Sequence, residues 1–273
     1  MSGEKKLQSD LQRALRGRMT CQTDKKGYVR VPTDNLVDGV SLEQFEADLR
    51  EGAGEELHMK FCACHSSTAL AVNCFAWFKR PGRLPYLTLS GSQGANDLRF
   101  ERRLPIFRGG TPPNIDVWIK RDGEIIAIES KLTEYFQKKQ AKFSKAYDRL
   151  ATPAQSELCW WSVYEQAKKG IPRHLDIAQL VKHYFGLWNY KQKLKTPKVI
   201  RFLYIFWEPQ DWEKVNVCRQ HRQECAELAQ ATEESHIPFN WLTYPELWQQ
   251  WLKIPVLAGH AKDLVARYDA RIT

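Results

Sequence analysis

The sequence predicts an α/β fold in which helices pack against a central β-sheet. Three observations support this fold class. Segments with apolar side chains at helical spacing alternate with short runs rich in β-branched and aromatic residues. The order of these segments is helix, three strands, helix, strand, with further helices and a strand appended. No glycine-rich phosphate loop follows any of the strands, which disfavours a doubly wound nucleotide-binding fold.

The first helix of this core is expected from Glu55 to Lys79, where apolar side chains recur at steps of three to four residues. Neither Gly nor Pro occurs in this stretch, and Pro81-Gly82 ends it. Residues 1–40 are polar and punctuated by Gly and Pro, so we expect a loosely packed N-terminal arm with a short helix over LQSDLQRALRGRM. Residues 41–273 are expected to form a single domain.

Three consecutive β segments follow the first helix. They are LRFERRL (98–104), IDVWIK (115–120) and EIIAIESKL (124–132). Asp122-Gly123 lies between the second and the third, and Asp-Gly is a favoured pair at the centre of a two-residue type I′ turn. The sequence therefore predicts a tight β-hairpin. The remaining elements are predicted as helices at 144–169 and 175–185, a buried strand at 199–207, a helix at about 212–231, a short strand near 239–242 and a helix from Pro245.

The bulk properties of the chain limit its class. Its 273 residues, 43% of them hydrophobic, can bury a large core. A formal charge of +9 favours a polyanionic partner such as nucleic acid, although basic proteins without such a partner also exist. Seven cysteines without the spacing of a small disulfide scaffold are expected to be reduced. No apolar stretch approaches the roughly 20 residues of a membrane span and no signal peptide is visible, so we expect a cytoplasmic protein that does not associate with membranes.

The hairpin turn sets a register that brings two acidic residues together. If Asp122 and Gly123 form the loop, cross-strand partners have numbers that sum to about 245, which places Asp116 directly opposite Glu129. Such partners hold their Cβ atoms about 4.5–5.5 Å apart, where two like charges repel unless a cation lies between them. Lys131 emerges on the same face, because side chains alternate along a strand. One hairpin therefore presents two carboxylates and an ammonium group.

This combination of charges suits the hydrolysis of phosphodiester bonds. Mg²⁺ prefers oxygen ligands and keeps several bound waters, and the main-chain carbonyl of Ser130 is a further candidate ligand beside Asp116 and Glu129. The ammonium group of Lys131 can orient an attacking water or stabilise charge that develops on a phosphate. The hairpin therefore predicts a Mg²⁺ site, in which Mn²⁺ is an expected substitute.

The pattern Asp116, twelve intervening residues, then Glu129-Ser130-Lys131 resembles the PD-(D/E)XK nuclease superfamily, which contains most restriction endonucleases. The predicted order of elements over roughly residues 50–210 is similar to the αβββαβ core of that superfamily, a central mixed sheet flanked by helices. The resemblance implies a Mg²⁺-dependent endonuclease that acts on DNA. It also implies that Asp116 and Glu129 bind the metal and that Lys131 orients the attacking water.

One departure from the superfamily pattern is the residue before the first acid. This residue is Ile115, and the motif proline, Pro113, lies further back. More narrowly, the chain resembles bacterial restriction-endonuclease-like proteins that join a Ser-Ser-x-Ala-Leu-x-x-Asn-x-Phe helix, here residues 66–75, to a Pro-Asn-x-Asp strand, here residues 113–116.

The resemblance also implies an accessory acid. Members of the superfamily often take a further metal ligand from the first core helix, and Glu56 ranks first for this role because it shares a helical face with Lys60. Its neighbour Glu55 and the strand residue Glu101 remain alternatives.

Contacts to nucleic acid are expected from a second helix and from a lysine-rich stretch. Gln179 with His183 or Tyr184 resembles a pair that touches the nucleic-acid backbone in many members of the superfamily. Lys138 and Lys139 lie just after the hairpin and would extend a positive track along the backbone, although a solvated surface is an equally good explanation of these two lysines.

Two other functions remain open at this point. The chain can be a catalytically inactive nucleic-acid-binding protein of the same fold, or a nuclease for RNA or for branched or single-stranded DNA. The predicted catalytic residues contact phosphate and not sugar, so they do not separate these substrates. A homodimer is consistent with duplex cleavage, which often needs two active sites, whereas sequence preference and cleavage pattern leave no signature in the chain.

Overall fold

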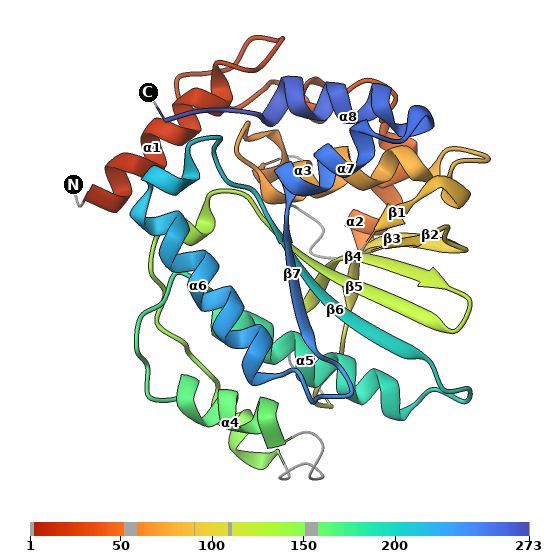
Figure 1. Cartoon of the computed structure of the whole chain (residues 1–273), viewed down its shortest axis with the longest axis vertical. Helices are drawn as coiled ribbons and strands as arrows, with labels where there is room; N and C mark the ends of the chain where they lie inside the picture. Colours follow the sequence, from red (N-terminus) through yellow and green to blue (C-terminus); the bar gives the residue numbers. More distant parts are fainter. Residues whose placement is uncertain (1–2, 52–58, 90, 109–110, 151–157, 273) are drawn as a thin grey trace.

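The computed structural model describes residues 3–51, 59–89, 91–108, 111–150 and 158–272. A five-stranded sheet with the order β3-β4-β5-β6-β7 lies at its centre. The first two pairings, β3–β4 and β4–β5, are antiparallel, and β5–β6 and β6–β7 are parallel. The predicted central mixed sheet flanked by helices is confirmed (Figure 1). The strands of this sheet are β3 (Asp97–Arg103), β4 (Asn114–Arg121), β5 (Glu124–Lys131), β6 (Val199–Phe206) and β7 (Phe239–Thr243).

Helices cover both faces of this sheet (Figure 1). Helices α5 and α6 lie on one face, and α3 lies on the other with α7 and α8 outside it. A small two-stranded sheet, β1 (Thr88–Leu89) with β2 (Ser92–Gln93), precedes the main sheet. The α-helices that the structure describes are α1 (Gly3–Arg16), α2 (Glu46–Glu51), α3 (Ser67–Phe75), α4 (Leu158–Ala167), α5 (Ile177–Gln192), α6 (Asn216–Ala231), α7 (Tyr244–Leu252) and α8 (Pro255–Tyr268). None of the helices in the described ranges is long and apolar enough for a bilayer crossing.

The predicted long helix over residues 55–79 is wrong in its described part. Helix α3 begins only at Ser67, because Ser66 has an extended backbone and its side chain accepts a hydrogen bond from the main-chain N–H of Ala69. Before this N-cap, the residues from Phe61 to Cys64 are all buried, but the chain forms only a short 3₁₀ turn at Lys60–Cys62 and no α-helix. After Phe75 the chain tightens into a 3₁₀ turn at Ala76–Lys79.

Two other predicted helices are shorter or interrupted. Only Leu158–Ala167 of the predicted helix at 144–169 is α-helical among the described residues, with a 3₁₀ turn at Lys145–Arg149 before it. The predicted helix at 212–231 is interrupted at Val215, whose extended backbone separates a 3₁₀ turn from α6. The helix predicted to end at residue 185 continues to Gln192.

Residues 3–40 pack against the rest of the protein, so the expectation of a loosely packed arm is wrong for this described part. Helix α1 buries Leu11 and Leu15 completely in the main hydrophobic core. The side chain of Arg267, from α8, donates hydrogen bonds to the main-chain oxygen of Leu15 and to the side-chain oxygen of Asn35. These contacts join the two ends of the described chain and fix α1 in place.

The hairpin between β4 and β5 has the predicted register. Val117 pairs with Ile128 and Arg121 pairs with Glu124. Of the two loop residues only Gly123 has a positive φ, of 70°, so the turn is not of the predicted type I′, which needs a positive φ at both. The hairpin is almost entirely buried because β6 and β3 flank it and helices cover both faces. Its far end, where Asp116 and Glu129 lie, is therefore held rigidly.

Helix α5 approaches the sheet closely at Gly186. A Cβ atom at this position would lie 2.6 Å from Leu104 Cβ and 2.9 Å from the main-chain oxygen of Leu104, just after β3. Only glycine permits this spacing, although glycine weakens a helix interior. The close approach sets the depth at which α5 presents its N-terminal half to the end of the hairpin.

Replacement of Gly186 by Ala should therefore destabilise the protein, in spite of the better helix propensity of Ala. We expect the free energy of unfolding to fall by about 1–3 kcal/mol, because the added methyl group must displace main-chain atoms. Denaturant unfolding measures this change. The matched control is Gly259→Ala in the exposed part of α8, where a Cβ meets nothing within 4 Å and a gain of up to about 1 kcal/mol is expected. Equal effects of the two substitutions would contradict the close approach.

Candidate active site

The candidate site begins with an irregularity in β3. The β3–β4 ladder pairs Phe100 with Val117 and Arg102 with Ile115, so Glu101 lies opposite Asp116 between these pairs. Glu101 has a φ of 51°, and it is the one non-glycine residue of the described chain with a positive φ. Such a backbone is unfavourable for a glutamate and persists only where the surroundings enforce it. The strain therefore marks this point of the sheet as a candidate functional site.

Asp116, at the start of β4, is bonded to the neighbouring strand through its side chain. Its Oδ2 accepts a hydrogen bond from the main-chain N–H of Ser130 at 2.6 Å. The regular β4–β5 ladder ends one step earlier, at the pair Val117 and Ile128. The carboxylate of Asp116 is thus fixed beside the main chain that joins Glu129 to Lys131.

Glu129 is completely buried, and each of its oxygen atoms lies close to a basic side chain. Oε1 accepts a hydrogen bond from Lys131 Nζ, and Oε2 lies 2.8 Å from Nε2 of His183 on α5. Lys131 is also buried, and it reaches the cavity described below. Ser130, between them, points to the other face of the sheet, where its hydroxyl lies 2.8 Å from the hydroxyl of Tyr244. The strand therefore alternates as predicted, with Glu129 and Lys131 on one face.

The pKa directions in this cluster follow from its charges. Removal from bulk water raises the pKa of Asp116 well above its usual range, and the carboxylates of Glu129 and Glu101 raise it further against the opposing effect of Lys131. For Glu129, burial also disfavours the charge, but Lys131 and His183 outweigh burial and hold the pKa at about 2. The Glu129–Lys131 pair therefore keeps its charges, whereas the surroundings of Asp116 disfavour a negative charge on its carboxyl group.

Glu101, Asp116 and Lys131 line a cavity of about 750 Å³. Strands β3, β4 and β5 contribute to its wall, together with α1, the N-terminal ends of α3 and α5, and the chain before α3. Helix α1 reaches the cavity because the side-chain amide of Gln8 donates a hydrogen bond to the main-chain oxygen of Thr133, after β5, at 2.9 Å. The lining residues include Gln8 of α1, Ser67 of α3, Glu101 of β3, Asp116 of β4, Lys131 of β5 and Gln179 of α5.

The other predicted site residues fall into three groups. Gln179 and His183 of α5 line the cavity with the hairpin, although His183 is buried against Glu129. Lys138 is exposed, and Lys139 forms an ion pair at 2.8 Å with Asp176, which caps α5 and also lines the cavity. Glu55 and Glu56 lie outside the described residues.

Two features of the site were not visible in the sequence. The contact between His183 and Glu129 depends on how deeply α5 packs, and residues 1–40 gave no sign that α1 would form a cavity wall. In the part of the chain that the structure describes, no three side chains of His, Cys, Asp or Glu are arranged as a ready metal site. The oxygen atoms of Glu129 are instead occupied by Lys131 and His183.

Loss of Lys131 should destabilise the protein independently of any activity. Lys131→Met leaves the charge of Glu129 buried without its main partner, so we expect the free energy of unfolding at neutral pH to fall by about 3–5 kcal/mol. The double variant Glu129→Gln, Lys131→Met should recover most of this loss. Denaturant unfolding in the presence of a chelator measures both.

A matched control for this double-mutant cycle lies on the neighbouring strand. Lys120 of β4 forms an exposed ion pair with Asp97 at 3.4 Å, and Lys120→Met should change the free energy of unfolding by less than about 1 kcal/mol. If the double variant is as unstable as Lys131→Met alone, the unpaired charge of Glu129 is not the cause of the lower free energy of unfolding.

Comparison with known proteins identifies the family of the chain. No curated protein and no solved structure matches it. Residues 6–269, almost the whole chain, match the family described as "Restriction Endonuclease associating with ARP". A match of this extent includes α1, the hairpin and the C-terminal helices together. The chain therefore belongs to this restriction endonuclease family.

Proposed function

We propose that the protein is a Mg²⁺-dependent endonuclease that hydrolyses phosphodiester bonds in DNA, with the active site of a PD-(D/E)XK nuclease. One observation carries the proposal: Asp116, Glu101 and Lys131 meet in the wall of one cavity, with Glu129 buried directly behind Lys131. Membership of a restriction endonuclease family supports a nuclease in general terms. The metal and the roles of individual residues belong to the proposal.

The donor atoms present fit a hard divalent cation. Two cavity-lining carboxyl groups lie on adjacent strands, and burial together with the charges of Glu129 and Glu101 raises the pKa of Asp116 more than Lys131 lowers it, so a further cation there would be favourable. We assign Asp116 and the main-chain carbonyl of Ser130 as groups that would hold Mg²⁺, with Mn²⁺ as a substitute. Glu129, the other ligand expected from the sequence, lies buried behind Lys131 and would join them only by exchanging a contact with Lys131 or His183 for the ion. When bound, the ion would lower the pKa of a water molecule and polarise the phosphate.

Glu101 is the accessory acid that the described residues favour. It lies opposite Asp116 on β3, it lines the cavity, and its charge contributes to the raised pKa of Asp116. Its strained backbone has a functional explanation if the kink aims the carboxylate at the metal site. Glu56 ranked first from the sequence because the first core helix was expected to begin earlier than it does.

Lys131 acts in this proposal as a charged group. Its hydrogen bond to Glu129 and the proximity of Asp116 hold it as an ammonium ion, so it donates hydrogen bonds and accepts none. In this state it can orient a water molecule and stabilise the additional negative charge on phosphate as the new P–O bond forms. His183 keeps Glu129 in place from the other side, which we prefer to the direct nucleic-acid contact expected from the sequence.

The cavity walls offer groups that suit a phosphate backbone. Ser67 and Thr68 lie in the first turn of α3, which contains no acidic residue, and the N-terminal end of a helix attracts anions. Gln179 and Lys182 of α5 line the same cavity. Lys138 and Lys139 lie beside the N-terminal end of α5 and would extend this contact outward.

Cleavage of circular DNA, supplied both in single-stranded form and as a duplex plasmid, tests the proposal directly. We expect the parent protein to cut DNA with Mg²⁺ and not with a chelator, and Asp116→Ala or Lys131→Ala to reduce the rate by on the order of 100-fold or more. The matched control is Asp122→Asn at the turn of the same hairpin, which keeps the hydrogen bond from Asn96 and should cut at the parent rate. Equal rates for the parent protein and the Asp116→Ala variant would exclude this active site.

The accessory role of Glu101 has a different signature. Glu101→Gln should raise the Mg²⁺ concentration needed for half-maximal cleavage by about 10- to 100-fold, because one negative group near the ion is lost. Glu101→Asp keeps the charge and should retain part of the affinity. A metal titration of the cleavage rate measures both variants, and an unchanged midpoint for Glu101→Gln would remove Glu101 from the site.

A further inference from the structure

An exposed aromatic side chain forms part of the cavity wall outside the carboxylate–lysine cluster. Tyr28 lines the cavity and is 37% exposed, and Lys60 and His65 line it nearby in the chain before α3. Phosphodiester hydrolysis as proposed above needs none of these three residues. Their combination of a ring with a lysine is nevertheless what a nucleotide requires, since a base has an apolar face and its phosphate is an anion.

Tyr28 is held in place by a tight turn. The side chain of Asp24 accepts hydrogen bonds from the main-chain N–H groups of Lys26 and Tyr28 at 2.8 and 2.9 Å, and the N–H of Asp24 donates to the main-chain oxygen of Tyr28. Gly27 has a φ of 85° and packs so closely that a Cβ atom would lie 2.8 Å from Cys64 Sγ. The turn is therefore rigid.

The same turn is joined to the chain that leads into α3. The main-chain N–H of Cys64 donates to the oxygen of Gly27 at 2.8 Å, and the N–H of Val29 donates to the oxygen of Cys62 at 2.9 Å. Tyr28 therefore projects from a segment that is fixed relative to the cavity, and little conformational entropy is lost when it binds a ligand.

His65 supports the ring of Tyr28 from the side. The two rings meet edge to face, with centroids 6.2 Å apart and an interplanar angle of 86°. Burial lowers the pKa of His65, so the imidazole is neutral at neutral pH and acts here as an aromatic support. Tyr28 is therefore supported by His65 while 37% of its surface stays exposed in the cavity wall, where a ligand can reach it.

We infer that Tyr28 is a stacking platform for an unpaired base, so that the substrate enters the site as single-stranded DNA and not as an intact duplex. The inference rests on the proposed function, since it assumes that the cavity receives nucleic acid. A volume of about 750 Å³ is in the range of pockets that enclose small molecules, which suits single nucleotides better than a double helix. Lys60 and Lys182 of the wall match the negative phosphates in charge.

Binding without metal separates this inference from catalysis. Fluorescence anisotropy with a dye-labelled single-stranded oligonucleotide and with its duplex, in a chelator-containing buffer, gives the two affinities of the full chain at equal salt. We expect the parent protein to prefer the single strand. Tyr28→Leu should weaken binding to the single strand by about 5- to 150-fold, the equivalent of about 1–3 kcal/mol per stacked base, and Tyr28→Phe should bind as the parent does.

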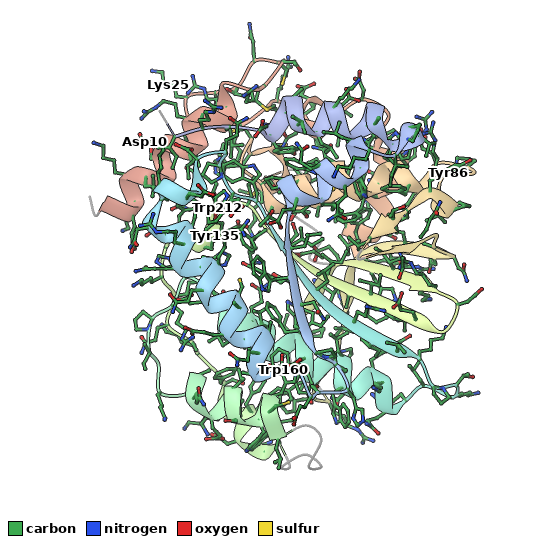
Figure 2. The ribbon with its side chains drawn as sticks, in the orientation of Figure 1. Asp10, Lys25, Tyr86, Tyr135, Trp160 and Trp212 are labelled. Atoms are coloured by element: carbon green, nitrogen blue, oxygen red, sulfur yellow. The ribbon has the colours of Figure 1, made fainter. Side chains whose placement is uncertain are left out.

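Tyr86 provides the matched control. It is 41% exposed, and Figure 2 shows it on the opposite side of the molecule from Asp10 of α1. Tyr86→Leu should leave both affinities unchanged. A second measurement uses a fluorescent adenine analogue in the single strand, whose emission should be quenched by stacking in the parent complex and recover in Tyr28→Leu.

Three results would overturn the inference: tighter binding of the duplex by the parent protein, unchanged single-strand affinity in Tyr28→Leu, or an equal loss in Tyr28→Phe. Any of these results together with loss of cleavage in Asp116→Ala would leave the proposed function intact. If instead stacking on Tyr28 is observed but cleavage does not depend on Asp116, the inference about Tyr28 stands and the proposed active site is wrong.

Discussion

The buried ion pair of Glu129 and Lys131 is the interaction on which the arrangement of the site depends. Burial of two charges costs several kcal/mol per ion, and the mutual attraction of the pair, with His183 on the second carboxylate oxygen, offsets this cost. The pair can exist only at the end of β5, because the preceding residues of the strand are enclosed by apolar side chains. The sheet core thus determines where charge can be placed, and the cavity lies at that point.

The site combines a paired set of charges on β5 with a strained backbone on β3. On β5 the charges of Glu129 and Lys131 balance each other. On β3 and β4 the residues Glu101 and Asp116 lie opposite each other, and the backbone of Glu101 is held in an unfavourable conformation. Both features lower the stability of the isolated protein. Strain and like charges that persist in a well-packed sheet are typical of positions kept for function.

The sequence predicted the hairpin and its register because both follow from local rules, namely the Asp122-Gly123 turn and the alternation of side chains along a strand. It did not locate the start of α3, since the buried segment from Phe61 to Cys64 has apolar residues that imitate helical spacing. The kink at Glu101 was also not predictable, because a positive φ at glutamate leaves no trace in composition. The contact of His183 with Glu129 depends on the close approach at Gly186, a tertiary feature.

The kink at Glu101 also affects β3 as an edge strand of the main sheet. In the described chain β3 has only one neighbouring strand in the main sheet, so its outer main-chain groups are available for pairing with a strand of another molecule. The N–H of Phe100 instead donates to Asp48 of α2, and one residue later the positive φ breaks the straight run of donors and acceptors. An incoming strand would find no continuous template there. The distortion at Glu101 thus also makes this edge of the sheet a poor template for strand-to-strand association between molecules.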